Sequence, residues 1–428
     1  MAEEREYKGY WWLPSNPNDK IAGVLHYTPE DGAKLEIFGS FKNAELNDNQ
    51  AIILGHTSTA KDITLFNCFG SFSITSRAFP VSKYSCHYFL EGRHLNSWDV
   101  KCFDWAVVEF DTLNIWCCPT ALTFYFQDKG FNLGYSHDRE VINETVIEDA
   151  KIALRDVVSF SSDHLEPKVK QCTQLKIERD GSDLDDFLRI IHIYRQFVSL
   201  ATLIPCESAE ITLYSNDDYQ DLGEGNKNYR ESVLYCKEFD SVKNEKAFVK
   251  AVSNSLFHYT DISDRYSEIL KKWFVDTKVL GPIREHLIDS ITHKPYFSSV
   301  DFLIVVQALE GFWWRLRDSN YKSSNNISPK KRTSLETIIE QLKNEFGDIS
   351  KTQINTINVA QVVDSRHYLS HFVDKSTKPN AVDGIELLLL SRKLRQLLVC
   401  CLLSTVGFSN NEINKMILES HNTIFRED

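Results

Sequence analysis

The spacing of hydrophobic residues changes once along this chain, and that change constrains its fold more than any other feature. Through about the first 180 residues, apolar and polar side chains alternate in short runs, as in strands with one buried face. From about residue 240 onward, the apolar residues recur every three or four positions, as on helices packed against a core. The sequence therefore predicts an α+β fold, in which a β-rich domain of sandwich or open-barrel type precedes an all-α bundle.

The same patterns predict the individual elements. Strands are predicted at 34–38, 62–66, 71–75, 106–110, 121–126, 174–178 and 210–214. Helices are predicted at 246–256, 264–274, 282–291, 299–317, 333–346, 354–372, 382–406 and 410–418.

Turn and capping residues indicate where some of these elements begin. Asp31-Gly32, between two strand-like runs, predicts a hairpin turn. Ser182, with Asp185 three residues later, predicts the capped start of a helix that interrupts the strands. Pro282 suits the first turn of its own helix.

Two polar stretches separate the elements. Residues 215–229 are rich in Gly and Asn and are expected to form a surface loop, and residues 318–332 are expected to be a linker between helices. The predicted domains are then a β-rich one at 1–255 and a helical one at 256–428.

The charge distribution narrows the classes of function. The net charge is −12, but residues 301–428 hold 16 Lys and Arg against 15 Asp and Glu, which leaves −13 for residues 1–300. An acidic front half argues against sequence-independent nucleic-acid binding through that surface. Any affinity for RNA therefore has to come from a local basic site in the back half.

No pattern for export or membrane insertion is present. The first residues lack a basic region followed by an apolar stretch, so no secretory signal is predicted. The most apolar segment, 385–406, is interrupted by three cations, which argues against insertion into a membrane. Ten cysteines without a signal favour reduced thiols, and we expect a cytoplasmic protein.

Arg366 and His371 are the candidate catalytic pair, in the segment DSRHYLSH at 364–371. Imidazole titrates near neutral pH and can move a proton to or from a ribose oxygen. Guanidinium stays charged, and its fork suits a phosphate whose negative charge grows in the transition state. The pair is a minimal set for cleaving RNA without a metal. Because this spacing arises easily by chance, its context has to support the assignment.

The helical context raises a geometric question. A step of five residues turns by about 140° on an ideal helix, so Arg366 and His371 do not share a face. Arg366 is long enough to curl around the helix, or a second copy across a dimer interface could complete the site. His367, one turn before His371, could orient or charge the site. Alternatively, Arg366 is tied to Asp364 or Asp374, and His371 is only a satisfied interfacial histidine.

A metal site is a weaker interpretation of the same segment. His367 and His371 could be a metal pair on one helix face, but Tyr368 stands where a zincin has its glutamate. The cysteines offer no better zinc site, because the chain has no C-x-x-C pair. It also has no Walker A loop. We therefore expect no metal centre and no nucleotide-hydrolysing site.

Several other side chains are supporting candidates. Glu310 interrupts an apolar helix and could orient Arg366 or a histidine, or it could lie solvated at the rim. Asp364 and Tyr368 belong to the same segment as the pair. Three cations on the long C-terminal helix are weak candidates for RNA contact, with a solvated charged face as the alternative. These cations are Arg392, Lys393 and Arg395.

Tryptophans are conspicuous in the front domain. Paired tryptophans on strands usually belong to a core, with an exposed ligand surface as the alternative. The residues in question are Trp11, Trp12, Trp105 and Trp116.

The combination of these segments resembles known families. Arg366 and His371 in a helical C-terminal domain, preceded by the helix that carries residues 307–312, resemble the HEPN (higher eukaryotes and prokaryotes nucleotide-binding) superfamily. The front half, with GYWWLP at 9–14 leading to IAGVL at 21–25, looks like the N-terminal domain of ApeA-type bacterial anti-phage proteins. Together the two resemblances cover nearly the whole chain.

The HEPN resemblance implies a mechanism. HEPN ribonucleases are metal-independent endonucleases whose helical bundles dimerise around two copies of the motif. By similarity, His371 assists attack by the ribose 2′-OH or protonates the leaving 5′-oxygen, and Arg366 steadies the phosphate. Ends with a 2′,3′-cyclic phosphate and a 5′-OH are expected, without a cofactor. His367 departs from the commonest family pattern, which has Asn or another polar residue after the arginine.

The ApeA resemblance implies abortive infection, in which the nuclease destroys host RNA, with tRNA as the candidate, after a phage component is sensed. The expected partners are RNA, a phage trigger that we expect to be a protein, and a second copy of the chain in a homodimer or larger homo-oligomer. Two other interpretations stay open. One is a non-catalytic HEPN sensor or scaffold, and the other is a front domain that binds carbohydrate.

Overall fold

The computed structural model describes most of the chain and divides it into two compact units. The described residues are 4–41, 49–73, 80–118, 122–127, 130–135, 141–161, 168–206, 210–237, 252–275, 277–292 and 299–425. The first unit comprises residues 1–114, 119–192 and 207–243, and the second comprises 115–118, 193–206 and 244–428. Because the two units interleave in sequence, no single residue separates them, and the limits 1–255 and 256–428 stay a prediction.

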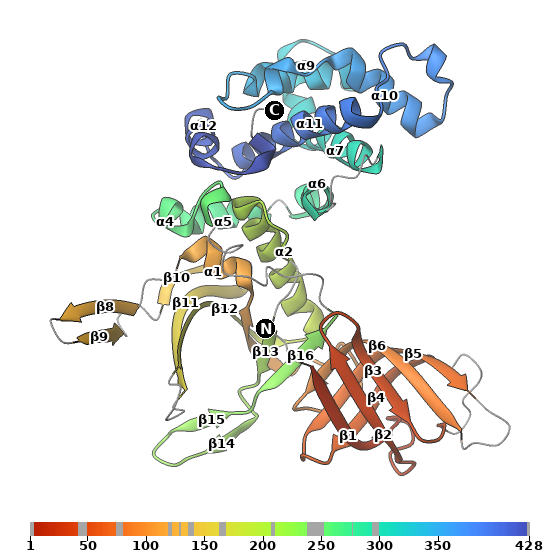
Figure 1. The fold of residues 1–428 in the computed structure, drawn as a ribbon, viewed down its shortest axis with the longest axis vertical. Helices are drawn as coiled ribbons and strands as arrows, with labels where there is room; N and C mark the ends of the chain where they lie inside the picture. The colour runs from red at the N-terminus through yellow and green to blue at the C-terminus, as the bar shows by residue number, and fades with distance from the viewer. Residues whose placement is uncertain are drawn as a thin grey trace. The chain divides into compact units, whose positions relative to one another are not determined.

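Six antiparallel strands of the first unit close into a barrel (Figure 1). They are β1 (Arg5–Trp12), β2 (Ile21–Thr28), β3 (Gly32–Ile37), β4 (Asn49–Thr57), β5 (Asp62–Ser73) and β6 (Val81–Glu91). Their order is β6-β3-β2-β1-β4-β5, and β5 pairs back with β6 to complete the closure. Alternate residues point inward, and the barrel core includes Trp11, Leu25 and Phe89, all fully buried.

The second half of β6 leads into an open sheet. Residues 88–91 of β6 pair with β16 (Ser232–Cys236). The sheet then continues through β13 (Glu210–Tyr214), β7 (Phe103–Glu109), β12 (Lys168–Ser182), β11 (Ala150–Ser161) and β10 (Val141–Ile147). Two further hairpins form separate small sheets: β8 (Leu122–Gln127) with β9 (Gly130–Tyr135), and β14 (Tyr219–Asp221) with β15 (Lys227–Tyr229).

The predicted β-rich front domain is confirmed, and its barrel is closed with an open sheet continuing from it. The hairpin at Asp31-Gly32 is also confirmed, because β2 pairs with β3 and Gly32 has a φ of +77°. The strands predicted at 62–66 and 71–75 are one strand, β5, and residues 74 and 75 lie outside the described residues. The stretch 215–229 is not all loop, because it contains the β14–β15 hairpin.

Helix α2 (Leu184–Thr202) starts one residue later than predicted. Asp183, not Ser182, is the capping residue, because its Oδ1 accepts a hydrogen bond of 3.0 Å from the Asp186 backbone N–H. Asp186 Oδ2 accepts one of 3.4 Å from the Asp183 N–H, which completes a reciprocal cap. Ser182 is the last residue of β12 and pairs with Phe103 of β7. It therefore belongs to the sheet and does not cap the helix.

The tryptophans of the first half are mainly core, as predicted. Trp11, Trp12 and Trp116 are all buried. Trp116 lies at the end of α1 (Asp111–Cys117). Trp105 is half-buried and stacks on Tyr214 with ring centroids 5.2 Å apart, so it packs on the face of the sheet.

The second unit is helical. Its helices are α4 (Tyr259–Ile262), α5 (Tyr266–Val275), α6 (Thr277–Thr292), α7 (Ser299–Phe312), the π-helix η2 (Trp313–Arg317), α8 (Asp318–Ser324), α9 (Leu335–Phe346), α10 (Val359–His371), α11 (Gly384–Thr405) and α12 (Asn410–Glu419). Helix α11 packs against α6, α7, α9 and α12 (Figure 1), and residues 397–403 of α11 are fully buried. Within the described ranges, no helix combines the length and apolar character needed to cross a membrane.

Several helix limits correct the sequence-based prediction. Pro282 lies inside α6 rather than in its first turn, because α6 already begins at Thr277. The stretch 318–332 is not all linker, because its first seven residues form α8. The helix predicted at 354–372 is broken before Val359, where Asn358 caps α10. The part of the first predicted helix at 246–251 lies outside the described residues.

Candidate functional site

Helix α10 determines where the predicted catalytic pair lies. Asn358 Oδ1 accepts hydrogen bonds from the N–H groups of Ala360 (3.1 Å) and Gln361 (3.3 Å) and so fixes the start of the helix. The helix ends at Phe372, which has a left-handed φ of +52°. Val362 and Ser365 form its buried face, so the side chains of residues 366, 367 and 371 remain on the accessible side.

Arg366 reaches across the helix to His371, as predicted from its length. Its Nη1 lies 3.0 Å from His371 Nε2, although the two residues do not share a face. A guanidinium group only donates hydrogen bonds, so Nε2 is the acceptor in this contact. The Nε2 lone pair is used in this contact, so Nε2 can act as a general base once the guanidinium turns to another partner such as a phosphate.

Glu310 holds the other side of the Arg366 guanidinium. Its Oε2 lies 3.6 Å from Arg366 Nη2, and the Glu310 side chain is buried on α7. Glu310 was expected either to orient Arg366 or to lie solvated at the rim of the helix. In the structure it is buried and forms an ion pair with Arg366. A buried carboxylate thus orients the cation that faces His371.

The alternative partners of Arg366 are occupied elsewhere. Asp364 Oδ2 accepts hydrogen bonds from the backbone N–H (3.1 Å) and the side chain (2.9 Å) of Asn380. Asp374 Oδ1 accepts one of 2.8 Å from the Ser376 N–H at the start of a short 3₁₀ turn. The interpretation in which Arg366 is tied to Asp364 or Asp374 is therefore wrong. Asp364 fixes the loop after α10 instead.

His367 and Tyr368 lie beside the pair. The rings of His367 and His371 are 5.8 Å apart at an angle of 65°. Burial lowers the pKa of His367 below 6.5, and the positive charges of Lys378 and Arg366 lower it further. Tyr368 is half-buried on the same helix. His367 is therefore neutral at pH 7 and presents no second positive charge to the site.

We expect an NMR titration to give a pKa below 6.5 for His367 in the folded chain, with His367→Gln used to assign its resonance. The unfolded chain has the ordinary value, so it takes up this proton first as the pH falls. The stabilisation from neutral His367 is present above pH 6.5 and is lost as the pH falls through the lower folded value. His367→Gln is therefore expected to flatten the loss of thermal stability on acidification. A measured pKa of 6.5 or higher would contradict this assignment.

Two of the three cations on α11, Arg392 and Arg395, hold contacts within the fold. Arg395 Nη2 lies 2.8 and 2.7 Å from the two carboxylate oxygens of Asp301, and both side chains are about nine-tenths buried. Arg392 donates hydrogen bonds to the carbonyls of Thr423 (2.5 Å) and Ile424 (3.1 Å). Both guanidiniums already hold contacts within the fold, and the predicted phosphate contact stays a prediction. Lys393 is half-buried beside them.

Two depressions flank Arg366. The α6 pocket, of about 400 Å³, is formed by α6, α7, η2 and Arg332. The α9 pocket, of about 350 Å³, is formed by residues 332–336 at the start of α9 and by α10 up to His367. Glu310, Arg332 and Arg366 line both pockets. His371 approaches Arg366 from outside the lining of either one.

Sequence reasoning missed the residues that shape the α6 pocket. They include His286, Trp314, Arg315 and Arg332. These residues lie far from Arg366 along the chain, so no motif spacing connects them with it. The only local signals are a tryptophan pair at 313–314, at the end of an apolar helix, and the cationic run PKKR at 329–332.

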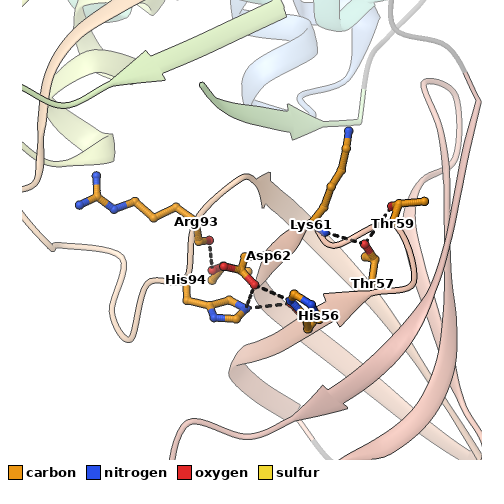
Figure 2. A network of polar contacts seen from close by, with 9 residues as sticks. His56, Thr57, Thr59, Lys61, Asp62, Arg93 and His94 are labelled. Atoms are coloured by element: carbon orange, nitrogen blue, oxygen red, sulfur yellow. Dashed lines mark hydrogen bonds and ion pairs between the residues drawn. The ribbon is translucent and has the colours of Figure 1, made fainter. Parts of the chain in front are cut away.

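A histidine–aspartate network in the barrel has a structural explanation. His56 Nδ1 lies 2.7 Å from Asp62 Oδ1, and His94 Nε2 lies 3.7 Å from the same oxygen. Figure 2 shows the two histidines on either side of this carboxylate. His94 also donates to a backbone carbonyl of β4 (2.8 Å), and Thr57 Oγ1 accepts from the Lys61 N–H (3.0 Å). These contacts hold the β4–β5 hairpin and the segment after β6. Across the described parts of the chain, no cluster of three or more His, Cys, Asp or Glu is arranged to hold a metal.

Comparison with known proteins links both halves of the chain to described families. The family ApeA N-terminal domain 1 matches residues 6–273, which is more than half of the chain. The family Apea-like HEPN matches residues 303–412, a range that contains Glu310, Arg366 and His371. No curated protein and no solved structure gives a match.

Proposed function

Because the chain belongs to the ApeA N-terminal domain 1 family and also carries an Apea-like HEPN domain, we propose that it is a metal-independent endoribonuclease that acts as an abortive-infection effector against phage. In this proposal the helical unit cuts host RNA, with tRNA as the candidate substrate, and the β-rich unit responds to a phage component. The observation that carries the proposal is the 3.0 Å contact between Arg366 and His371.

The proposed reaction needs only groups of this kind. The 2′-oxygen of a ribose attacks the adjacent phosphorus, the bond to the 5′-oxygen breaks, and a 2′,3′-cyclic phosphate and a 5′-OH result. When the phosphate binds the Arg366 guanidinium, the hydrogen bond from Arg366 to His371 Nε2 breaks and Nε2 takes the proton from the 2′-OH, while Arg366 stabilises the charge on the phosphate. The leaving oxygen needs a proton from a second imidazole, which is in its protonated form at the start of the step. A second copy of the chain supplies it in the homodimer that we propose.

The surroundings of His371 support this dimer. Phe372 follows His371 directly, and 92% of its surface is exposed. In the proposed homodimer the second copy covers this apolar side chain. A second copy that packs on Phe372 would bring its own imidazole to the same place.

Changing Glu310 to glutamine is expected to slow RNA cleavage by up to about 100-fold, because the neutral amide holds the Arg366 guanidinium less firmly. Glutamine has nearly the same shape, so the packing of α7 is expected to survive. Initial cleavage rates measured with purified protein check this expectation. Glu336→Gln, a carboxylate change in the α9 pocket, is the matched control and is expected to retain the activity. Equal rates for the two variants would show that Glu310 does not position Arg366.

The decisive experiment is performed in cells. RNA 5′-OH ends are sequenced during phage challenge in cells that express the wild type or His371→Ala. New ends that appear only with the wild type support the ribonuclease and identify the RNA. If the wild type protects the cells without producing such ends, the chain is a non-catalytic HEPN sensor or scaffold instead.

A further inference from the structure

The α6 pocket adjoins the Arg366–His371 pair but has no role in the reaction proposed above. Arg366 and Glu310 form the wall that it shares with the α9 pocket. A group bound in the α6 pocket therefore lies directly beside a phosphate bound at Arg366. Its volume of about 400 Å³ lies within the range of small-ligand sites.

The lining of the α6 pocket is positively charged. Arg315, Arg332 and Arg366 contribute three charges, against one carboxylate, from Glu310. Arg315 Nη1 donates to the Val279 carbonyl (2.7 Å), which anchors its guanidinium at the edge of the pocket. Within the described ranges, no carboxylate lies within ion-pair distance of Arg332. The pocket is thus suited to a ligand that carries phosphate.

An aromatic surface accompanies this charge. The Arg332 guanidinium lies over the Trp314 ring, 4.4 Å from its centroid, and 37% of the Trp314 surface is exposed. Nucleobases stack on aromatic rings and on the planes of arginine guanidiniums. The Arg332–Trp314 stack therefore offers a flat face on which a base can lie.

The backbone is distorted where it presents these residues. The Asp318 N–H bonds to the Trp313 carbonyl five residues back, so residues 313–317 form a π-helix between α7 and α8. Such turns are rare, and they occur frequently at functional sites. In this chain the wider turn carries both Trp314 and Arg315, the two residues of η2 that line the pocket.

We propose that the α6 pocket is a nucleotide subsite, which binds one unpaired nucleotide of the RNA next to the phosphate held by Arg366. The base stacks on the Arg332–Trp314 pair, and the flanking phosphate lies between Arg332 and Arg315. This inference rests on the proposed ribonuclease function and specifies its substrate. A base can enter the pocket only if it is unstacked, so the cut falls in a single-stranded loop or end.

The test measures binding by the full chain to a short 2′-O-methyl oligonucleotide, whose blocked 2′-oxygens prevent cleavage. Fluorescence anisotropy is expected to show that Trp314→Ala and Arg332→Ala each weaken binding about 5- to 150-fold, the range for loss of one stacked base. Lys331→Ala removes the same charge from a neighbouring exposed residue outside the pocket lining. It is expected to weaken binding by less than about twofold.

Arg332→Lys separates stacking from charge. Lysine keeps the positive charge for the phosphate but has no planar group for the base, so it is expected to recover part of the affinity lost in Arg332→Ala and to stay well below the wild type. Wild-type affinity in Arg332→Lys would overturn the subsite in favour of general electrostatic attraction, and so would an equal loss in Lys331→Ala. Undiminished binding by Trp314→Ala would overturn it too. If Trp314→Ala does not fold, the exposed Arg332 variants decide the question.

Unmodified RNA separates this inference from the proposed function. His371→Ala is expected to bind the oligonucleotide like the wild type but to cleave nothing. If cleavage depends on His371 while the Trp314 and Arg332 variants keep both their affinity and their KM, the subsite is wrong and the ribonuclease proposal stands. If the wild type cleaves no RNA but these variants lose affinity as expected, the ribonuclease proposal is wrong and the nucleotide site stands.

Discussion

His371→Ala is expected to slow RNA cleavage by about 10²- to 10⁴-fold, with EDTA present throughout, because the variant loses the group that moves the proton. The His371 side chain is exposed and contacts the Arg366 guanidinium at 3.0 Å, so its removal leaves no cavity. Thermal unfolding of the variant is therefore expected to match that of the wild type. The measurement is the initial rate of cleavage of a tRNA mixture by purified full-length protein.

Two further variants make this result specific. His421→Ala removes another exposed histidine of the second unit and is expected to keep full activity. Arg366→Lys keeps the charge but loses the planar fork, and is expected to remain far below the wild type. Cleavage that persists in His371→Ala, or that disappears equally in His421→Ala, would exclude His371 as the catalytic histidine.

Asp301→Ala is expected to destabilise the helical unit by about 3–5 kcal/mol, because it leaves the buried Arg395 guanidinium without its charge partner. The two side chains are only 10% and 12% exposed, and Arg395 reaches both carboxylate oxygens. Calorimetric unfolding of the full chain measures the effect, and hydrogen exchange in α7 and α11 locates it.

The control for Asp301 is an exposed ion pair of the same unit. Glu268 and Lys272 are 63% and 44% exposed, so Glu268→Ala is expected to change the stability little. The double variant Asp301→Leu/Arg395→Met removes both buried charges, and is expected to recover most of the stability lost in Asp301→Ala. If Asp301→Ala and Glu268→Ala unfold alike, the buried pair does not stabilise the bundle.

Local patterns predicted the elements well, but they could not predict how distant elements combine. The alternation in 34–38 and 62–66 correctly indicated strands. The closure of the barrel depends on β5 pairing with β6 along its whole length, and no local pattern encodes that pairing. The start of α2 was predicted one residue too early. Ser182 and Asp183 are both good capping residues, and Asp183 is the cap because Ser182 is paired in the sheet.

In the candidate site, too, local patterns were informative, whereas contacts between residues far apart in the sequence could not be predicted. Arg366, His371 and Glu310 could be selected from sequence because two of them form a motif and the third is a charge in an apolar helix. Arg395 was selected for the same kind of reason, but its contact with Asp301, 94 positions away, could not be predicted from any local pattern. Arg332 could not be selected at all, because only the folded bundle brings it beside Arg366.

The strand β6 belongs to two structures at once. On one edge, residues 82–86 bond to β3 inside the barrel, and residues 88–91 bond to β16 in the open sheet. The other edge bonds to β5. Because both share β6, the barrel and the open sheet are joined by continuous backbone hydrogen bonding and have no edge between them along this strand.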